Sequence, residues 1–393
     1  MLKYWQEALK FLRSDATFRQ IVFYSEGAHT WVHLKPLART LIEVHGRKIG
    51  YLTSSADDPG IEFCGQSNLT FCIGDGVART ALFKALDASV LVTTTPDLGG
   101  PLFQRSSRGT HYAYIHHSMV STHMIYKRTA FEQFDTIFCV GPHHIAETRA
   151  MEELYGLPQK STVAHGYGRL DRLLAMRHSD MTTRPTTNGL ITEGTPHVLL
   201  APTWGYRGLI ETVGPRLVRV LLEAGFRVTL RPHPETLKRT PQAVKDTADA
   251  GGNNKTRFVL ERDVSTLNSL LESDVMISDW SGIALEFAFG LERPVLFVDV
   301  PKKVLNDDYQ RIPLSPLEIS IRETIGAVVE SDQIEKIPII LREMIDTRHR
   351  WRDTIAAARD EYVFNLGQSA KIGAEHLMRI ADRKPLSPGS DAE

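Results

Sequence analysis

Residues 275–299, VMISDWSGIALEFAFGLERPVLFVD, carry the pattern that decides the fold class. A short apolar run opens this stretch, a turn follows at residues 278–282, and residues 283–289 place apolar side chains at helical spacing. Gly290 ends the predicted helix, and Pro294 comes just before a second apolar run. The stretch therefore predicts a strand, a sharp turn, a helix and a second buried strand, which is the βαβ unit of an α/β protein.

The turn at residues 278–282 lies where α/β proteins bind their ligands, beyond the carboxyl end of a strand. Its serines, at a helix N-terminus, offer hydroxyls and free backbone N–H groups that suit a phosphate. An ordinary crossover with a capped helix explains the same residues, so both interpretations stand at this point.

The same alternation of short apolar runs and amphipathic segments extends over most of the chain. Further strands are predicted at residues 21–27, 48–55, 68–74, 89–96, 111–118, 134–141, 198–204, 226–234 and 256–262. Helices are predicted at residues 33–46, 76–88, 142–156, 212–224 and 266–273, with long helical segments from about 332 to 382 that break at 364–369. Two βα series separated by a polar Thr/Gly/Pro-rich stretch predict two Rossmann-like domains facing across a cleft, with C-terminal helices returning to the first domain.

The pattern also predicts domain boundaries. These are an N-terminal domain at 1–183, a linker at 184–197, a C-terminal domain at 198–368, a returning helix at 369–382 and a disordered tail at 383–393.

Composition restricts the class of protein. The formal net charge of −1 implies no general polyanion-binding surface, although it leaves local basic patches open, and no nucleic-acid partner is expected. Three cysteines (Cys64, Cys72, Cys139) without CxxC spacing fit a reducing cytosol. The first fifteen residues alternate apolar and charged side chains, which predicts an amphipathic helix rather than a signal peptide. No apolar run approaches the roughly 20 residues of a membrane span, so a soluble, cytoplasmic protein is expected.

Histidines follow the predicted strand at 111–118 and supply the first candidates for chemistry. His116 or His117 could act as a general base, because the pKa of histidine lies near neutral pH. The alternative is that one of the pair is only packed, since neighbouring strand residues face opposite sides. Other histidines lie nearby in sequence at His111, His123, His143 and His144. Their spacing matches no known ligand pattern, so no metal site is expected.

Two further motifs lie at predicted strand ends. In Arg231-Pro232-His233-Pro234 the prolines would hold the imidazole rigidly, although a turn with an incidental histidine is the alternative. In HGYGRLD, Arg169 could pair with a phosphate through its planar guanidinium, and Asp171 follows it. The alternative there is an N-cap aspartate beside a surface arginine.

Taken in order, these motifs form a recognisable series. They are IHHS (115–118), VGPHH (140–144), GYGRLD (166–171), LAPTW (200–204), RPHP (231–234), SDWSGIALEFA (278–288), RPVLFVD (293–299) and FNLGQS (364–369). Over residues 110 to 375 the series resembles the CDP-glycerol glycerophosphotransferase family, whose members help build teichoic acids and related cell-envelope polymers. The resemblance implies a GT-B fold in which the C-terminal domain holds most of the nucleotide donor.

The resemblance also implies roles for individual residues. His116 matches the family's general base, and His233 matches a histidine that steadies the donor phosphates. The remaining donor or phosphate contacts that it implies are Thr203, Arg231, Asp279, Ser281, Gly282, Glu286, Arg169 and Asp171, with His117, Asn365 and Ser369 as additional candidates. This sequence departs from the family at three places: Ile115 stands for a tryptophan, His117 for a glycine and Gly282 for a second serine.

The expected reaction follows from that resemblance. His116 deprotonates an acceptor hydroxyl, which attacks the β-phosphorus of CDP-glycerol or a similar CDP-alditol and expels CMP. His233, Ser281, Arg169 and the helix N-terminus after Trp280 meet the charge on the transferring phosphate. No DxD motif is present, so protein groups are expected to meet the charge on the leaving group. The sequence requires no cofactor and leaves the need for a divalent metal open.

The expected acceptor is a cell-surface polymer or a lipid-linked molecule, which implies peripheral contact with the inner face of the cell membrane. The amphipathic N-terminal segment or the loop with Arg105 and Arg108 could supply this contact. The alternative, which the pattern favours, is that these are a packed helix and a solvated loop. Two alternatives remain for the function. One is a GT-B sugar-nucleotide glycosyltransferase or UDP-sugar epimerase, and the other is a non-catalytic nucleotide-binding scaffold.

Overall fold

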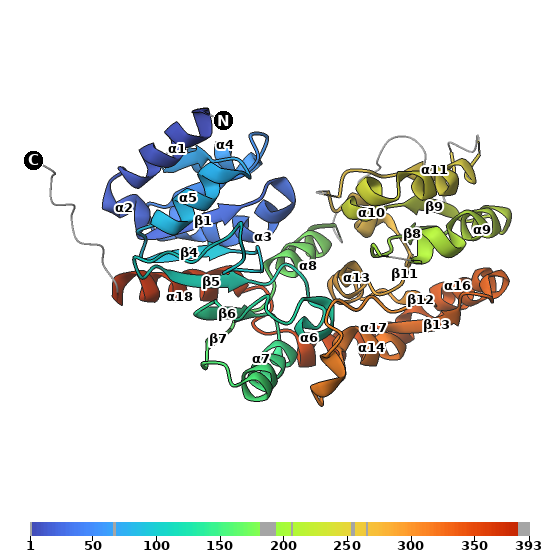
Figure 1. Cartoon of the computed structure of the whole chain (residues 1–393). Helices are drawn as coiled ribbons and strands as arrows, with labels where there is room; N and C mark the ends of the chain where they lie inside the picture. The colour runs from blue at the N-terminus through green and yellow to red at the C-terminus, as the bar shows by residue number, and fades with distance from the viewer. Residues whose placement is uncertain are drawn as a thin grey trace, which may run out of the picture. The chain divides into compact units, whose positions relative to one another are not determined.

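The computed structural model describes residues 2–65, 68–180, 194–205, 207–252, 256–264 and 266–383. The chain divides into two compact units, each built around one parallel sheet (Figure 1). Unit 1 comprises residues 1–117, 126–169 and 363–393, and unit 2 comprises residues 118–125 and 170–362. The linker predicted at 184–197 lies outside the described residues up to position 193, and the tail predicted at 383–393 does so from position 384.

Unit 1 contains a seven-stranded sheet in the order β3-β2-β1-β4-β5-β6-β7, in which all neighbouring strands are parallel. Its strands are β1 (Ile21–Ser25), β2 (Gly50–Thr53), β3 (Leu69–Cys72), β4 (Val90–Thr93), β5 (His111–Ile115), β6 (Thr136–Cys139) and β7 (Ser161–Ala164). Its helices are α1 (Leu2–Leu12), α2 (Ala16–Arg19), α3 (Ala28–Arg39), α4 (Pro59–Gly65), α5 (Val77–Ala85), α7 (Pro142–Tyr155) and α18 (Ser369–Arg383).

Both faces of this sheet are covered, because successive strand side chains point to opposite sides. Val22 and Tyr24 of β1 belong to one core together with residues of α1 and α5. Ile21 and Phe23 belong to the other core, with residues of α3 and α18. The C-terminal helix α18 is therefore part of unit 1, which confirms the predicted return of the chain.

Unit 2 contains a six-stranded parallel sheet in the order β10-β9-β8-β11-β12-β13. Its strands are β8 (His197–Leu200), β9 (Arg227–Leu230), β10 (Phe258–Leu260), β11 (Val275–Ser278), β12 (Val295–Asp299) and β13 (Gly326–Glu330). Its α-helices are α6 (Thr122–Ile125), α9 (Leu209–Glu223), α10 (Pro234–Arg239), α11 (Pro241–Asp249), α12 (Asn268–Glu272), α13 (Gly282–Leu291), α14 (Leu317–Ser320), α15 (Arg322–Ile325), α16 (Ile337–Asp346) and α17 (Arg348–Tyr362). Helix α8 (Gly168–Asp180) begins in unit 1 and continues in unit 2.

The predicted α/β class with two parallel sheets is confirmed, and several element boundaries differ from the prediction. Strand β5 ends at Ile115, so the two histidines predicted at its end lie in the following loop. Helix α3 begins at Ala28 instead of residue 33 and continues as a π-helix over Thr40–Val44. Strand β13 was not predicted, because its sequence GAVVE is short and follows an irregular segment. Within the described residues no helix is both long and apolar enough to span a bilayer.

Candidate functional site

His116 is the first residue after β5, at the carboxyl end of the sheet in unit 1. Its side chain is buried, with 2% exposure, and within the described part of the chain neither ring nitrogen has a hydrogen-bond partner. Burial lowers the pKa of His116 well below the ordinary range, and the nearby His117 lowers it further. The imidazole is therefore neutral at physiological pH, which is the protonation state that a general base needs.

His117 lies in a different environment from its neighbour. Its Nδ1 is 3.1 Å from the Tyr114 hydroxyl and 3.1 Å from the Thr94 carbonyl oxygen. Its Nε2 is 3.1 Å from the Tyr126 hydroxyl. Because both nitrogens of His117 have partners within the protein, the geometry favours His116 over His117 as the base.

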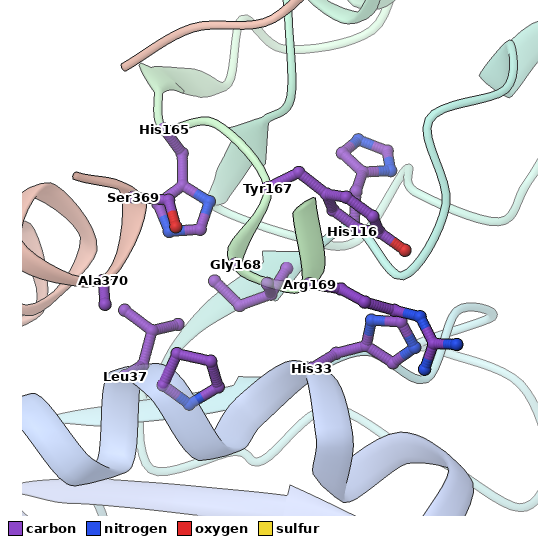
Figure 2. Close-up of a pocket in the computed structure, with 11 residues that line it drawn as sticks. His33, Leu37, His116, His165, Tyr167, Gly168, Arg169, Ser369 and Ala370 are labelled. Carbon is purple, nitrogen blue, oxygen red and sulfur yellow. The ribbon is translucent and has the colours of Figure 1, made fainter. Parts of the chain in front are cut away.

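A small cavity of about 10 Å³ lies beside His116 (Figure 2). This volume has room for one water-sized group. Helix α3, the end of β5, the turn between β7 and α8, and the start of α18 enclose it. The residues that line it are His33, Pro36, Leu37, Ile115, His116, His165, Tyr167, Gly168, Arg169, Ser369 and Ala370.

The turn between β7 and α8 forms one wall of the cavity and is tightly fixed. Gly166 has φ +98°, and any Cβ there would collide with the Phe364 carbonyl oxygen. The Tyr167 hydroxyl donates to the His117 carbonyl at 3.0 Å. Asn365 donates to the Ala164 carbonyl oxygen at 2.7 Å, which ties the segment before α18 to this turn. We therefore expect Asn365 to position the chain, whereas Ser369, fully buried, lines the cavity itself.

Arg169 and His33 lie side by side at the same cavity (Figure 2). Arg169 is the second residue of α8, and Asp171 follows in the first turn, where its charge suits a helix N-terminus. Burial lowers the pKa of His33 well below the ordinary range, and the charge of Arg169 lowers it further. The sequence did not single out His33, since a histidine within an amphipathic helix carries no distinguishing pattern.

In unit 2 the turn at residues 278–282 is held by three bonds to neighbouring strand ends. The Ser278 hydroxyl donates to the Ala201 carbonyl at 2.8 Å, and the Trp280 indole N–H donates to the Val300 carbonyl at 2.9 Å. Between them, an oxygen of Asp279 accepts the Thr203 backbone N–H at 2.7 Å. This leaves Ser281 and Gly282 as the partly exposed residues of the turn. The Ser281 hydroxyl makes no capping bond to α13.

Asp279 was predicted as a donor contact, and the structure gives it a different position. Its side chain is buried under the turn, with 1% exposure. Burial raises the pKa of Asp279 to about 6, although several backbone N–H groups and the charge of Lys303 act in the opposite direction. We therefore expect Asp279 to fix the backbone of Thr203. Glu286, one turn into α13, is also buried.

The Gly282 position adjoins a residue from a distant part of the chain. A Cβ at Gly282 would collide with the hydroxyl of Ser118. Ser118 opens the segment 118–125, which belongs to unit 2. The carboxylate of Glu318 anchors this segment by accepting the Ser121 backbone N–H at 2.8 Å and the Ser121 hydroxyl at 2.7 Å.

His233 caps helix α10, where its Nδ1 accepts the Glu235 backbone N–H at 3.1 Å. A neutral ring with Nδ1 as acceptor carries its proton on Nε2, so His233 can donate a hydrogen bond to a phosphate oxygen. The ring of Trp204 lies 6.2 Å from that of His233, and the Lys303 ammonium lies 3.8 Å above the Trp204 ring. Burial lowers the pKa of Lys303 to about 8.

A second cavity, of about 580 Å³, lies in unit 2 and is large enough for a nucleotide-sized ligand. Its lining residues are Trp204, Gly205, Arg207, Glu211, Thr212, Glu235, Thr236, Arg239 and Thr240. Trp204 and Lys303 were not predicted as site residues. The LAPTW motif could have drawn attention to Trp204, whereas Lys303 lies in a segment with no periodic pattern.

Arg231 was predicted to contact the donor phosphates, but its guanidinium is buried and already bonded. It donates to Glu261 at 3.1 Å, to the Ser269 hydroxyl at 2.8 Å, and to the carbonyl oxygens of Val264 and Thr266. We therefore expect Arg231 to hold this loop in place. Among the described residues no group of three or more His, Cys, Asp or Glu side chains is arranged to hold a metal ion.

Comparison with known proteins gives one family match. Residues 80–328 match the model of the CDP-glycerol:poly(glycerophosphate) glycerophosphotransferase family. No curated protein matches this sequence.

Several solved structures have a similar fold. The wall teichoic acid polymerase TagF is 12% identical, covers 98% of this chain and 95% of its own, and has a TM-score of 0.63. The UDP-GlcNAc 2-epimerase from Neisseria meningitidis is 14% identical, covers 91% of this chain and 99% of its own, and has a TM-score of 0.57. At these identities the likeness concerns the fold, which is of the GT-B class.

Proposed function

Because the chain belongs to the CDP-glycerol:poly(glycerophosphate) glycerophosphotransferase family, we propose that it moves glycerol phosphate from CDP-glycerol to a hydroxyl of a polymer or lipid-linked acceptor and releases CMP. The observation that supports this most directly is His116, a buried and neutral imidazole whose two nitrogens have no partner within the described residues. It lies beside a cavity with room for one hydroxyl oxygen.

In the proposed reaction, His116 takes the proton from the acceptor hydroxyl. The hydroxyl oxygen forms a new bond to the β-phosphorus of CDP-glycerol, and the bond from that phosphorus to the bridging oxygen breaks. CMP leaves with the bridging oxygen. Positioning and electrostatic stabilisation supply most of the acceleration in phosphoryl transfers of this kind.

We assign the donor to unit 2, where suitable groups lie at the carboxyl ends of the strands. His233 offers an Nε2–H donor, and Ser281 offers a hydroxyl at the N-terminus of α13. Lys303, beside Trp204, adds a positive charge for the departing phosphate. We also keep Asp171 and Glu286 as candidate contacts to the donor. The same reaction would use CDP-ribitol if the donor pocket accepts the longer alditol.

The proposal is tested by measuring CMP release from CDP-glycerol and CDP-ribitol, alongside UDP- and GDP-sugars, with a glycerol-phosphate-terminated acceptor. His116→Asn should lower turnover at least about 100-fold. The variant should keep its thermal stabilisation by CDP-glycerol. His29→Asn, an exposed histidine on α3, is the matched control and should retain full activity.

Other outcomes of this experiment identify the alternatives. Turnover of UDP- or GDP-sugars alone would indicate a different GT-B enzyme. Binding without turnover of any donor would indicate a non-catalytic scaffold. Full activity of His116→Asn would exclude the proposed base.

We further propose that α1 attaches the protein to the inner face of the cell membrane. One face of α1 packs into the core through Ala8 and Phe11. The opposite face leaves Leu2, Trp5 and Leu9 exposed at helical spacing, by 74%, 38% and 46%. The exposed cationic residues Lys3, Lys10 and Arg13 flank this apolar stripe, and this combination suits an anionic bilayer surface.

Vesicle sedimentation tests this attachment. The protein should bind phosphatidylglycerol vesicles more strongly than phosphatidylcholine vesicles, and the triple change Leu2→Ser, Trp5→Ser and Leu9→Ser should abolish binding. The control is Val44→Ser with Val77→Ser, which removes two exposed apolar side chains elsewhere in unit 1. Equal binding by the triple variant would refute the role of α1.

A further inference from the structure

Three aromatic rings pack around the imidazole of His116, the proposed base. The ring of His144 lies closest: the two ring centroids are 3.9 Å apart and the planes differ by 32°, so the rings lie nearly face to face. The rings of Tyr114 and Phe131 lie 5.0 Å and 5.6 Å away, at steeper angles of 86° and 60°. Because neither nitrogen of His116 has a hydrogen-bond partner within the described residues, these ring contacts set its orientation.

The backbone of unit 1 holds His144 in place. His144 lies in the first turn of α7, which starts at Pro142 just after β6, and its side chain is fully buried. The Val140 backbone N–H donates to Nδ1 of His144 at 3.3 Å. A ring nitrogen that accepts a hydrogen bond carries no proton, so His144 is neutral, with its proton on Nε2. The base therefore faces an uncharged aromatic ring whose position the fold determines.

The stack has its largest effect when His116 carries a charge. Burial lowers the pKa of His116 well below the ordinary range, and His117, His143 and His165 lower it further, so an imidazolium at this position is costly. In the described part of the chain no carboxylate bonds to either ring nitrogen. The face of a neutral aromatic ring attracts a cation. The contact between His144 and His116 thus strengthens as the proton arrives, and contacts that strengthen in the transition state accelerate the chemical step.

We propose that His144 is a positioning residue for the base: its ring fixes the imidazole of His116 and stabilises the charge that His116 gains when it accepts a proton. This inference deepens the proposed function and rests on it. We assign no substrate contact to His144, because its side chain is fully buried and does not line the cavity beside His116. By sequence His144 is one of several neighbouring histidines without a ligand pattern, whereas in the fold its ring is stacked on the base.

Substitutions at residue 144 separate the ring from the rest of the side chain. His144→Leu and His144→Phe both remove the acceptor of the Val140 N–H, and only phenylalanine keeps an aromatic face toward His116. In steady-state CMP release from CDP-glycerol, His144→Leu should lower kcat about 10-fold, as expected when a cation loses an aromatic face. His144→Phe should stay within about threefold of wild type. The KM for CDP-glycerol should not change in either variant.

A third variant keeps the test valid if phenylalanine does not fit the site. His144→Gln retains an acceptor oxygen for the Val140 N–H and lacks the ring, so it should lose kcat as His144→Leu does. The control is His111→Leu, at the start of β5, where Nε2 of His111 lies 2.8 Å from the Thr136 hydroxyl. This variant also loses one histidine hydrogen bond in unit 1, and its kcat should match that of wild type.

Nuclear magnetic resonance of protein with isotope-labelled histidine reports the stack without turnover. The ring signals of His116 are identified by their absence from His116→Asn. They should carry the ring-current shift of residue 144 in wild type and His144→Phe, and lose it in His144→Leu and His144→Gln.

Several results would overturn the inference. Equal kcat values in His144→Leu and His144→Phe, or wild-type kcat in His144→Gln, would refute the role of the ring. A raised KM for CDP-glycerol with unchanged kcat would make His144 a binding residue instead. Absence of the ring-current shift in wild type would refute the stack itself. Failure of the proposed function is distinguishable, because wild type would then release no CMP, while the ring signals would still show whether His144 fixes His116.

Discussion

Asp279→Asn gives a quantitative test of the buried carboxylate under the turn at residues 278–282. One oxygen of Asp279 accepts the Thr203 N–H at 2.7 Å, and the other has no partner among the described groups. Burial raises the pKa of this carboxyl from 3.8 to about 6. Asparagine keeps an acceptor oxygen for Thr203 and removes the charge, so the substitution isolates the electrostatic part of the free energy of unfolding.

The sign and size of the effect follow from linkage. The folded protein holds the Asp279 proton more tightly than the unfolded chain, so wild-type stability falls as pH rises from 3.8 to about 6 and is then constant. The full shift corresponds to about 3 kcal/mol. Between about pH 5 and about pH 8, wild type should lose about 1 kcal/mol relative to Asp279→Asn, because part of the titration is complete at the lower pH.

Urea unfolding of wild type and Asp279→Asn at these two pH values measures the difference between their free energies of unfolding. The other carboxylates are the same in both proteins, so their contributions to the pH dependence cancel. The expected result is a gain in the relative stability of the variant at the higher pH. Asp353→Asn, an exposed aspartate on α17, is the control and should show no such change. A stability difference that is equal at both pH values, or smaller at the higher pH, would refute the argument.

Two further predictions concern residues that hold unit 2 together. Arg231→Met should lower the free energy of unfolding by about 1–3 kcal/mol, because Glu261 loses its cationic partner and the carbonyl oxygens of Val264 and Thr266 lose a donor, while the hydroxyls of Ser269 and Thr266 still donate to Glu261. The KM for CDP-glycerol, measured where the variant is folded, should stay unchanged, and a large rise would support Arg231 as a donor contact. Gly282→Ala should cost no more than about 1 kcal/mol, because the Ser118 hydroxyl that its Cβ would meet can rotate to another rotamer. Adding Ser118→Gly should recover most of that loss in urea unfolding, and strictly additive effects would contradict the contact.

Strands and helices were predictable from the sequence where one hydrophobic pattern extended over the whole element. An apolar run ending in Gly27 located β1, an apolar run followed by the turn at residues 278–282 located β11, and the helical stripe at residues 283–289 located α13. Strand β13 carries too few residues to show a period, so it was missed. The assignment of residues 118–125 to unit 2 depends on Glu318, far along the chain, and no local pattern reports such a contact.

The site was predictable to the extent that motifs mark strand ends. His116 and Ser281 were predicted in this way, because ligands bind beyond the carboxyl ends of parallel strands. The two histidines at 116 and 117 could not be separated by sequence, since the difference between them lies in the hydroxyls of Tyr114 and Tyr126 around one ring. His33 and Lys303 were missed because packing, not spacing, brings His33 to the cavity beside His116 and Lys303 to the ring of Trp204.

Gly282 departs from the family motif, but the structure still has a hydroxyl group at this position. By sequence, glycine at this position removes a hydroxyl that the family resemblance places at the N-terminus of α13. In the structure the Ser118 hydroxyl occupies the space that a side chain at 282 would enter, so a hydroxyl is present there but comes from another segment. The absence of a side chain at Gly282 makes room for the Ser118 hydroxyl. Glu318 anchors the segment 118–125, to which Ser118 belongs. Gly282 and Glu318 therefore both help to place the Ser118 hydroxyl, and this relation is visible only in the folded chain.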